Sequence, residues 1–349
     1  MDQQPSSSSR SDSIQVLVDA NLAQDDLQQL REREGLCVTV ADPVVETESV
    51  VRPAQLIADV QFLLCSYLPR NLSDMRQLKL LQLASSGYSQ IQGLGLSTRG
   101  VHVCNARGVN DTAIAEWNVA MMINLSRSLP RMLKNQELHV WDRANVFQTE
   151  IHGTTVGIWG YGGIGRQTAR LCKALGLKVH VLVRSEIGPI RNRYCVPDLG
   201  DTHGILPDRV FPINECAEFL KTLNFLILCL SLNSATEGIV GEDELRALPK
   251  SAFVLNPARG PLIQQTALLH ALREGWIAGA AIDTHHQYPM PSEHPLWSFE
   301  NVILTPHITG SSGSTHFTSR LASLFSQNID RLLSDQPLLN ELSPYELGD

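Results

Sequence analysis

Short apolar runs alternate with longer polar stretches through the first third of the chain. The apolar runs have the length of strands, and the first polar stretch between them, residues 22–34, has the length of a helix. Alternation of this kind is typical of βαβ units, which build a parallel sheet. The runs predict strands within residues 14–20, 36–42, 60–66, 78–87 and 100–108.

A second series of apolar runs begins at residue 154, after one long predicted helix over residues 112–133. Six strand-like runs in succession suit a doubly wound parallel sheet. Residues 184–223 contain an irregular, proline-rich stretch, and the amphipathic helix predicted at 316–335 is expected to return to the first domain. The runs predict strands within 154–160, 177–184, 223–232, 251–260, 277–283 and 301–307, with helices at 241–249 and 264–276.

The overall composition is that of a globular α/β protein with about two domains. Hydrophobic residues make up 43% of its 349 residues and charged residues 18%, and the net charge of −8 offers no basic face to nucleic acid or membrane. The seven dispersed cysteines indicate reduced thiols. Residues 1–13 are Ser-rich and predict a disordered leader, not a signal peptide. We therefore expect a cytoplasmic protein with no nucleic-acid or membrane partner.

A glycine-rich segment, TVGIWGYGGIGRQTARLCKALG, lies between an apolar strand and an amphipathic helix. It places Gly160, Gly162 and Gly165 at GxGxxG spacing, a weak signal alone because many glycine loops merely turn. In this context Gly160 permits the tight turn, Gly162 admits a pyrophosphate and Gly165 lets the helix pack on the strand. The helix N-terminus supplies N–H groups and partial positive charge. The segment therefore predicts a dinucleotide site.

The residues after the second strand of this series indicate which dinucleotide binds. An Asp or Glu there would hold the ribose 2′-OH of NAD, but the chain has Arg184 and Ser185, with Glu186 further into the loop. A guanidinium and a hydroxyl bind a 2′-phosphate that a carboxylate repels. We predict NADP, with NAD possible, and consider Arg191 and Arg193 as further phosphate partners. The alternative is that Arg184 is a solvated loop residue.

Six motifs, ASSGYSQI, NDTAIAEW, GYGGIG, NPARGPLI, AAID and TPHITG, occur in an order and spacing typical of one family. By these motifs the chain resembles the D-isomer-specific 2-hydroxyacid dehydrogenases. The resemblance implies two Rossmann-like domains and a homodimer. The substrate domain is discontinuous, residues 14–115 plus 308–349, and the dinucleotide-binding domain covers residues 116–307. The implied reaction transfers a hydride between NADP(H) and a small 2-oxoacid or D-2-hydroxyacid, such as glyoxylate or hydroxypyruvate.

The resemblance also implies roles for individual residues. Arg259 would pair with the substrate carboxylate, which suits a planar, permanently charged group. His307 would be the acid–base, because imidazole titrates near neutral pH. The implied substrate contacts are Ser86 and Gly87, through their backbone N–H groups, and Asn110. The expected cofactor contacts are Gly160, Gly162, Gly163, Ile164, Gly165, Thr112, Arg184, Ser185, Leu230, Pro257, Ala258, Asp283 and Gly310. Without the family, His307 would be a structural residue at a strand end, Arg259 a helix-entry residue with or without a function, Ser86–Gly87 a turn and Thr112 a helix cap.

The stretch DTHHQYPMPSEHPLW, residues 283–297, departs from the family pattern. In most members a glutamate five residues after the aspartate braces the catalytic histidine, and here that position is Tyr288. We interpret the stretch as an acid–base site without its usual acid, where Tyr288, Gln287 or His286 takes its place. No metal site is expected, because His285 and His286 are adjacent, would point apart on an extended loop and have no acidic or cysteine cluster to complete a ligand set. A polar loop without a chemical role is the remaining alternative.

The missing acid has consequences for the histidine and for the function. A carboxylate beside an imidazolium raises its pKa, so we expect His307 to have a lower pKa than in glutamate-bearing relatives. Two other functions stay open. One is a dinucleotide-sensing binding protein like the corepressors of the family, and the other is a hydride-transfer enzyme with an atypical substrate, of the formate or phosphite type, for which Asn110 is suggestive.

Overall fold

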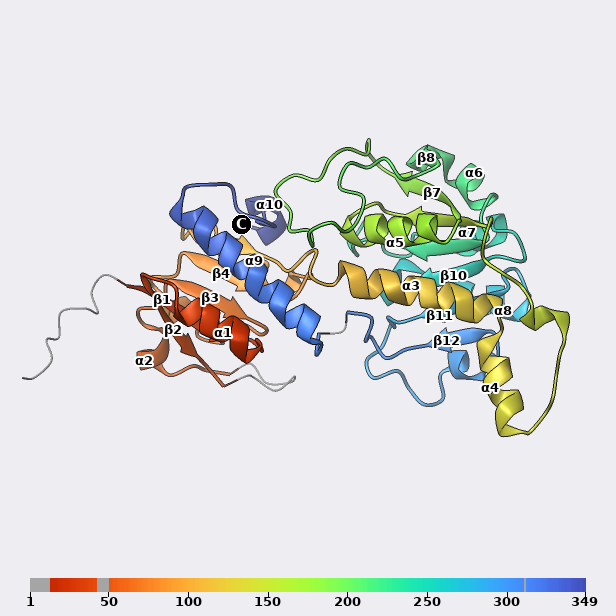
Figure 1. Ribbon diagram of the computed structural model, residues 1–349, viewed down its shortest axis with the longest axis horizontal. Coiled ribbons are helices and arrows are strands. Elements are labelled where there is room, and N and C mark those ends of the chain that lie inside the picture. Colours follow the sequence, from red (N-terminus) through yellow and green to blue (C-terminus); the bar gives the residue numbers. More distant parts are fainter. Residues whose placement is uncertain (1–12, 43–49, 311) are drawn as a thin grey trace, which may run out of the picture. The chain divides into compact units, whose positions relative to one another are not determined.

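The computed structural model describes residues 13–42, 50–310 and 312–349, so the predicted leader lies outside the described residues except for Ser13. The chain divides into two compact units. The first unit holds the chain up to Val109 together with Arg191–Val196 and Ser312–Asp349, and the second holds Asn110–Ile190 and Pro197–Ser311. Both are α/β units, as the sequence predicts (Figure 1).

The first unit contains a five-stranded parallel sheet of order β2-β1-β3-β4-β5. One face of the sheet packs on α1 and α9, through apolar residues such as Leu30, Leu321 and Phe325 (Figure 1). The other face is covered by loops, short helices and the last residues of the chain, including Leu347. The elements are β1 (Ile14–Asp19), α1 (Gln24–Arg31), β2 (Leu36–Val40), α2 (Ala54–Ile57), β3 (Phe62–Cys65), η1 (Leu72–Asp74), β4 (Leu80–Leu83), η2 (Ser89–Ile91), β5 (His102–Cys104), α9 (Thr315–Leu333) and α10 (Pro344–Leu347).

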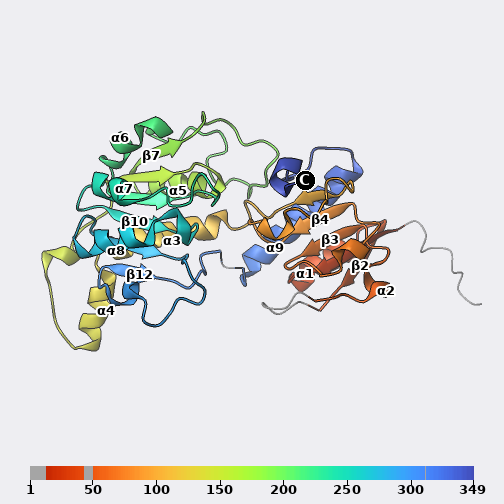
Figure 2. The ribbon, with the colours of Figure 1, turned by 180° about the vertical axis from the view of Figure 1, so that it is seen from behind.

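The second unit contains a seven-stranded parallel sheet of order β12-β11-β10-β9-β6-β7-β8. Helices α3 and α5 cover one face and α6, α7 and α8 the other, which gives three layers (Figures 1 and 2). The elements are α3 (Asp111–Ser126), α4 (Leu129–Glu137), η3 (Asn145–Phe147), β6 (Thr155–Trp159), α5 (Gly163–Ala174), β7 (Lys178–Val183), β8 (Arg209–Pro212), η4 (Ile213–Glu215), α6 (Cys216–Leu220), β9 (Phe225–Leu228), α7 (Glu242–Ala247), β10 (Phe253–Asn256), η5 (Gly260–Leu262), α8 (Gln265–Arg273), β11 (Gly279–Ile282), η6 (Pro295–Ser298) and β12 (Val302–Leu304).

Two predictions of local structure were wrong. The long helix expected over 112–133 is two helices, α3 and α4, which meet at Ser128 with φ 50°. Pro130 explains the break, since its ring cannot follow four residues of continuous helix without clashing with a carbonyl. The irregular stretch after residue 184 contains β8, an edge strand whose sequence RVFP has one buried side chain and a proline.

The boundaries of the units are set by packing that local patterns do not show. All of α3 belongs to the second unit, where buried Asn118 donates from Nδ2 to Thr168 Oγ1 at 3.1 Å. The segment Arg191–Val196 belongs to the first unit because Tyr194 is buried in its core, and the Tyr194 N–H donates to Asn340 Oδ1 at 3.1 Å.

The topology of the second unit defines one functional edge. Since all seven strands are parallel, their carboxyl ends lie at the same edge of the sheet. The strand order reverses between β6 and β9, and the crevice outside such a reversal is where ligands bind in open α/β sheets. None of the helices in the described part of the chain is long and apolar enough to cross a membrane.

Candidate active site

The glycine-rich loop follows β6 at this edge. Gly160 has φ 96°, and a Cβ there would lie 2.6 Å from the Cys229 carbonyl oxygen. A Cβ at Gly165 would lie 2.5 Å from the Gly160 carbonyl oxygen, so both positions require glycine. A Cβ at Gly162 would meet nothing within 4 Å, and no side chain caps α5 at Gly162. Open space therefore lies beside Gly162 at the start of α5, where the backbone N–H groups of a helix N-terminus suit a pyrophosphate.

The loop after β7 is tied to the glycine-rich loop through a buried network. The Tyr161 hydroxyl donates to Asp201 Oδ2 at 2.7 Å. The Arg166 guanidinium donates to the Asp201 and Gly188 carbonyl oxygens at 2.5 and 2.6 Å. These bonds hold Gly188 and Asp201 against the start of α5. Arg184 and Ser185 are exposed between this anchor and the end of β7.

Other predicted cofactor residues lie around the same loops. Leu230, after β9, approaches Gly160, and the Asp111 carboxylate lies against Gly163 in the space that a side chain would need. Thr112 lies in the first turn of α3. Asn110, just before it, has its side chain near Gly310, and its Oδ1 is buried without a partner among the described residues. That acceptor is available to a ligand that donates a hydrogen bond.

Asp283, at the end of β11, is fully buried and holds the loop that follows β12. Its Oδ1 accepts from Thr305 Oγ1 at 2.5 Å and from the Ile308 N–H at 3.0 Å. Its Oδ2 accepts from Thr309 Oγ1 at 2.7 Å and from the Thr309 N–H at 3.2 Å. The main chain adds a bond from the His307 N–H to the Asp283 carbonyl, 2.8 Å. The structure thus gives this carboxylate four donors from one loop.

His307 sits at the centre of that loop with φ 58°, a left-handed conformation that non-glycine residues rarely adopt. The bonds to Asp283 on both sides of it hold that conformation. The side chain is exposed at the functional edge. Burial of the ring lowers the pKa of His307 below its ordinary value, the Arg259 guanidinium lowers it further, and the Asp283 carboxylate opposes both.

Arg259 follows β10 and is positioned by its own loop. Asn256 spans the turn, accepting from the Ala258 N–H at 3.1 Å and donating from Nδ2 to the Arg259 carbonyl at 2.8 Å. The guanidinium donates from Nη1 to the Ala258 carbonyl at 2.6 Å and is otherwise exposed. Pro257 and Ala258, two of the predicted cofactor residues, form this turn. Arg259 is thus a cation close to His307 with donors left for a ligand.

Of the three side chains considered as replacements for the missing acid, Tyr288 alone contacts His307. The two rings lie 5.5 Å apart between centroids, tilted by 45°. The Tyr288 hydroxyl accepts from the His285 N–H at 3.0 Å, and His286 Nε2 bonds the Ile263 carbonyl at 3.0 Å. Gln287 is exposed. No hydrogen bond from the described residues reaches the His307 ring. Of the charged groups that act on its pKa, Arg259 lowers it and Asp283 raises it.

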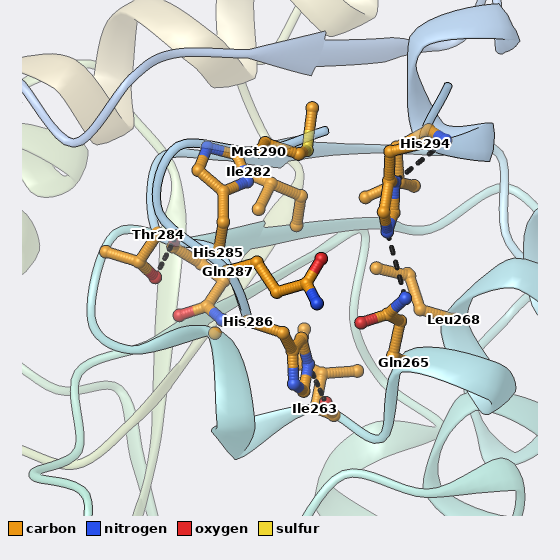
Figure 3. A pocket seen from close by; sticks show the side chains of 13 residues that line it. Ile263, Gln265, Leu268, Ile282, Thr284, His285, His286, Gln287, Met290 and His294 are labelled. Carbon is orange, nitrogen blue, oxygen red and sulfur yellow. Dashed lines mark hydrogen bonds between the residues drawn. The ribbon is translucent and has the colours of Figure 1, made fainter. Parts of the chain in front are cut away.

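The other histidines of the stretch line a small pocket behind this loop (Figure 3). Its polar side chains include His285, His286, Gln287 and His294, and its apolar ones Ile263, Leu268, Ile282, Met290 and Leu296. Each of the three histidines is engaged separately, with a carbonyl oxygen or with Gln265. Within the residues that the structure covers, no three His, Cys, Asp or Glu side chains are placed to share a metal ion.

The predicted carboxylate loop, Ser86 and Gly87, belongs to the first unit and follows β4. The Ser86 hydroxyl donates to the Ala106 carbonyl at 3.2 Å, and Asn105 Nδ2 donates to the Ser86 carbonyl at 3.0 Å. These bonds leave the N–H groups of Ser86 and Gly87 without an acceptor among the described residues. Arg191 and Arg193 also belong to the first unit.

Sequence reasoning missed the residues that position these groups. They are Thr305 and Thr309, which bond the Asp283 carboxylate, Asn256, which shapes the Arg259 turn, and His285. The threonines flank the histidine in TPHIT, and Asn256 precedes the proline in NPARG, so the motifs contained the residues without showing their partners.

Comparison with known proteins gives consistent results. The family model described as "D-isomer specific 2-hydroxyacid dehydrogenase, NAD binding domain" matches residues 119–309. A glyoxylate reductase of Thermofilum pendens is 30% identical over 263 residues, covering 74% of this chain and 73% of that protein. A D-3-phosphoglycerate dehydrogenase of Dictyostelium discoideum is 28% identical over 316 residues, covering 88% of this chain and 72% of that protein.

Solved structures share the fold. A D-isomer specific 2-hydroxyacid dehydrogenase from Xanthobacter autotrophicus, in complex with NADPH and MES, has a TM-score of 0.73 at 23% identity and covers 97% of this chain and 100% of its own. An NADPH-dependent glyoxylate/hydroxypyruvate reductase from Sinorhizobium meliloti, in complex with NADP and sulfate, has a TM-score of 0.72 at 20% identity, with 96% and 100% covered.

Replacing Asp283 by Asn tests the hold of this carboxylate on the loop. The amide keeps one acceptor oxygen and turns an N–H₂ group toward two donors, so two charge-assisted bonds of about 1.5 to 3 kcal/mol each are lost. We expect the amide hydrogens of Ile308 and Thr309 to exchange at least about ten times faster. Hydrogen exchange followed by NMR measures this, with exposed Asp243→Asn as the control. Unchanged protection of both amides would show that the carboxylate does not hold the loop.

Proposed function

Because the chain belongs to the D-isomer specific 2-hydroxyacid dehydrogenase family, it is an NAD(P)-dependent oxidoreductase, and we propose that it reduces a small 2-oxoacid with NADPH. The single observation that carries this proposal is the pairing of Arg259 and His307 beside the glycine-rich loop, at the carboxyl edge of one sheet. A fixed cation and a proton donor are what reduction of a 2-oxoacid requires. The glyoxylate reductase among the relatives supports a small substrate.

In this proposal the guanidinium of Arg259 binds the substrate carboxylate. Its Nη1 already donates to Ala258, so the ion is oriented before substrate arrives, and its remaining donors bond no other described residue. A preoriented planar cation suits a carboxylate and also draws electron density from the adjacent carbonyl. The N–H groups of Ser86 and Gly87 are proposed as further carboxylate donors, and Asn110 as a further substrate contact.

His307 donates the proton. When bound, the nicotinamide supplies the hydride that reaches the carbonyl carbon. The imidazolium of His307 gives its proton to the carbonyl oxygen as negative charge develops there, and the reverse reaction needs the neutral ring. Because the side chain is exposed, the ring regains its proton from water. Tyr288 is proposed to pack against the ring, with no proton of its own transferred.

The residues around the glycine-rich loop are proposed to hold the cofactor. The start of α5 would bind the pyrophosphate, and Arg184 with Ser185 would bind the 2′-phosphate. The buried Asn110 Oδ1 is proposed as an acceptor for the nicotinamide, and Asp283, whose oxygens accept from the loop after β12, is proposed to lie beside it. The full set of proposed contacts is Gly160, Gly162, Gly163, Ile164, Gly165, Thr112, Arg184, Ser185, Leu230, Pro257, Ala258, Asp283 and Gly310.

We propose that the chain forms a homodimer through α4 and the loop after it. Trp141 is 91% exposed, and Leu133, Leu138 and Val140 are at least half exposed on the same segment. The segment also lines a groove of about 660 Å³, and it projects from the sheet of its unit (Figure 1). An apolar ridge beside a groove suits a two-fold contact, in which one patch meets its own copy.

We also propose that the protein works in the reducing cytoplasm. Cys65, Cys104 and Cys172 are buried free thiols. Burial raises the pKa of the Cys172 thiol to about 12 and also raises those of Cys65 and Cys104, so these groups stay protonated and unreactive. Fractionation of expressing cells tests the location.

Initial rates with NADPH and NADH, each with glyoxylate, hydroxypyruvate, pyruvate and phenylpyruvate, test the proposed reaction. We expect turnover that prefers NADPH. Arg184→Ala is expected to raise KM for NADPH about ten-fold or more, since a charge-assisted bond to phosphate is lost, and to leave NADH unchanged. Exposed Arg273→Ala is the control. Cofactor binding without turnover on any oxoacid would favour the dinucleotide sensor or an atypical substrate.

The pH dependence of reduction tests the role of His307. The protonated ring is the reactive form, so its low pKa makes the rate fall, as pH rises, at a lower pH than an ordinary imidazole would allow. Tyr288→Glu adds a carboxylate beside the ring and should move this fall to higher pH. Tyr288→Gln, similar in size and neutral, should not. An identical pH profile for the Glu variant would argue against the ring as the titrating donor.

Sedimentation of wild type and of Trp141→Asp tests the dimer. We expect a dimeric wild type and a largely monomeric variant, because a charge cannot be buried unpaired in an apolar contact. Tyr345→Asp, on an equally exposed aromatic of the first unit, is the control. A monomeric wild type, or a dimer that survives Trp141→Asp, contradicts the proposed interface.

A further inference from the structure

We propose that His285 is a positioning residue for His307. It orients the His307 ring through a hydrogen bond to Thr305 and a ring contact with Tyr288, where an acidic partner would orient it with a charged group. The proposal rests on the proposed function, in which His307 is the proton donor. His285 comes two residues after Asp283, and its side chain is 91% buried. It is therefore a fixed part of the fold just behind the exposed catalytic ring.

The tautomer of His285 follows from its partner. Nε2 lies 2.9 Å from the Thr305 carbonyl oxygen. A carbonyl can only accept, so Nε2 carries the proton and donates it. In the neutral ring Nδ1 is then an acceptor, and it is buried without a partner among the described residues. The pocket lined by His285 has room for about 30 Å³ of water (Figure 3), enough for one water molecule.

The bond to Thr305 acts on the loop that carries His307. Thr305 is held at two points, its hydroxyl by the Asp283 carboxylate and its carbonyl by the His285 ring. The His307 N–H, two residues on, is held by the Asp283 carbonyl. Asp283 thus fixes the loop on both sides of the left-handed residue, and His285 adds a second bond to the chain that enters it.

Tyr288 connects the same two histidines through its ring. Its hydroxyl accepts from the His285 N–H at 3.0 Å, which sets the direction of a side chain that is 56% exposed. The ring lies 6.1 Å from the His285 ring at 63° and 5.5 Å from the His307 ring at 45°, between centroids. His285 therefore contacts the support of His307 on two sides, through Thr305 and through Tyr288.

Nothing in this arrangement adds a negative charge near His307. A hydrogen-bonded carboxylate would fix the ring but also favour its protonated form. His285 restricts the imidazole through Thr305 and through the Tyr288 ring, without that effect. The arrangement separates two roles, orientation and charge, that an acidic partner combines.

Kinetics of His285→Phe and His285→Gln in the full chain test the proposal. Phe keeps the packing and removes the donor, whereas Gln places an amide N–H near the position of Nε2. We expect His285→Phe to lower kcat between about 10-fold and 100-fold, the usual effect of a misplaced catalytic group. KM for the oxoacid and Kd for NADPH should stay within about two-fold of wild type. His285→Gln should recover most of kcat.

His294→Phe is the matched control, because His294 lines the same pocket but its ring bonds Gln265 and the Leu296 N–H, not Thr305. Its kcat should stay near that of wild type. An equal loss in His285→Phe and His294→Phe would mean that pocket packing matters and the bond to Thr305 does not. A His285→Gln variant as slow as His285→Phe would equally overturn the proposal.

NMR of protein labelled with ¹⁵N-histidine decides the question without turnover. Signals of His285 and His307 are assigned from His285→Gln and His307→Gln. We expect the Nε2–H tautomer at His285, and a His307 signal that broadens or shifts in His285→Phe but not in His294→Phe. The Nδ1–H tautomer, or an unchanged His307 signal, overturns the proposal. If wild type binds NADPH yet reduces no oxoacid, the proposed function fails while this spectrum still tests the positioning role.

Discussion

The site depends above all on one buried carboxylate. Removing Asp283 from water carries a large desolvation cost, which is offset only if every lone pair finds a donor. Those donors are the side chains and amides of Thr305, Ile308 and Thr309. The carboxylate therefore also constrains the loop. To place these donors around Asp283, the loop after β12 adopts a left-handed backbone conformation at His307. The position of the exposed imidazole follows from the need to satisfy a charge that solvent does not reach.

The electrostatics of the edge then follow from what surrounds that imidazole. Arg259 lies close enough to lower the pKa of His307, and Asp283, whose oxygens are engaged with the loop, opposes this only in part. With Tyr288 in place of an acid, the ring is neutral over more of the pH range. A neutral imidazole is the base needed to take a proton from a hydroxyl. Between the lowered pKa of His307 and its ordinary value, the neutral ring therefore slows reduction and favours oxidation.

Much of the fold could be predicted from local patterns, because buried parallel strands are short apolar runs and all but one of them were found. β8 was missed because an edge strand needs only one buried side chain. The break at Ser128 was missed because apolar residues continue on both sides of it. The placement of Arg259, His307 and Asp283 after strands was predictable from their motifs, while their roles stay predictions. The partners that orient them were not, because the bonds from His285 to Thr305 and from Tyr194 to Asn340 join residues far apart in sequence, and no local pattern encodes such pairs.

The discontinuity of the first unit has a consequence for synthesis. Its sheet is translated first, but α9, which supplies Phe317, Leu321, Phe325 and Ile329 to one face of that sheet, is translated near the end. At typical rates of elongation, the roughly 200 residues between them take about 10 to 40 s. For that time the emerging chain exposes an apolar sheet face that it cannot yet cover, while the second unit is folding. During this time the N-terminal sheet, although fully synthesised, is the part of the nascent chain most exposed to aggregation and most in need of a chaperone.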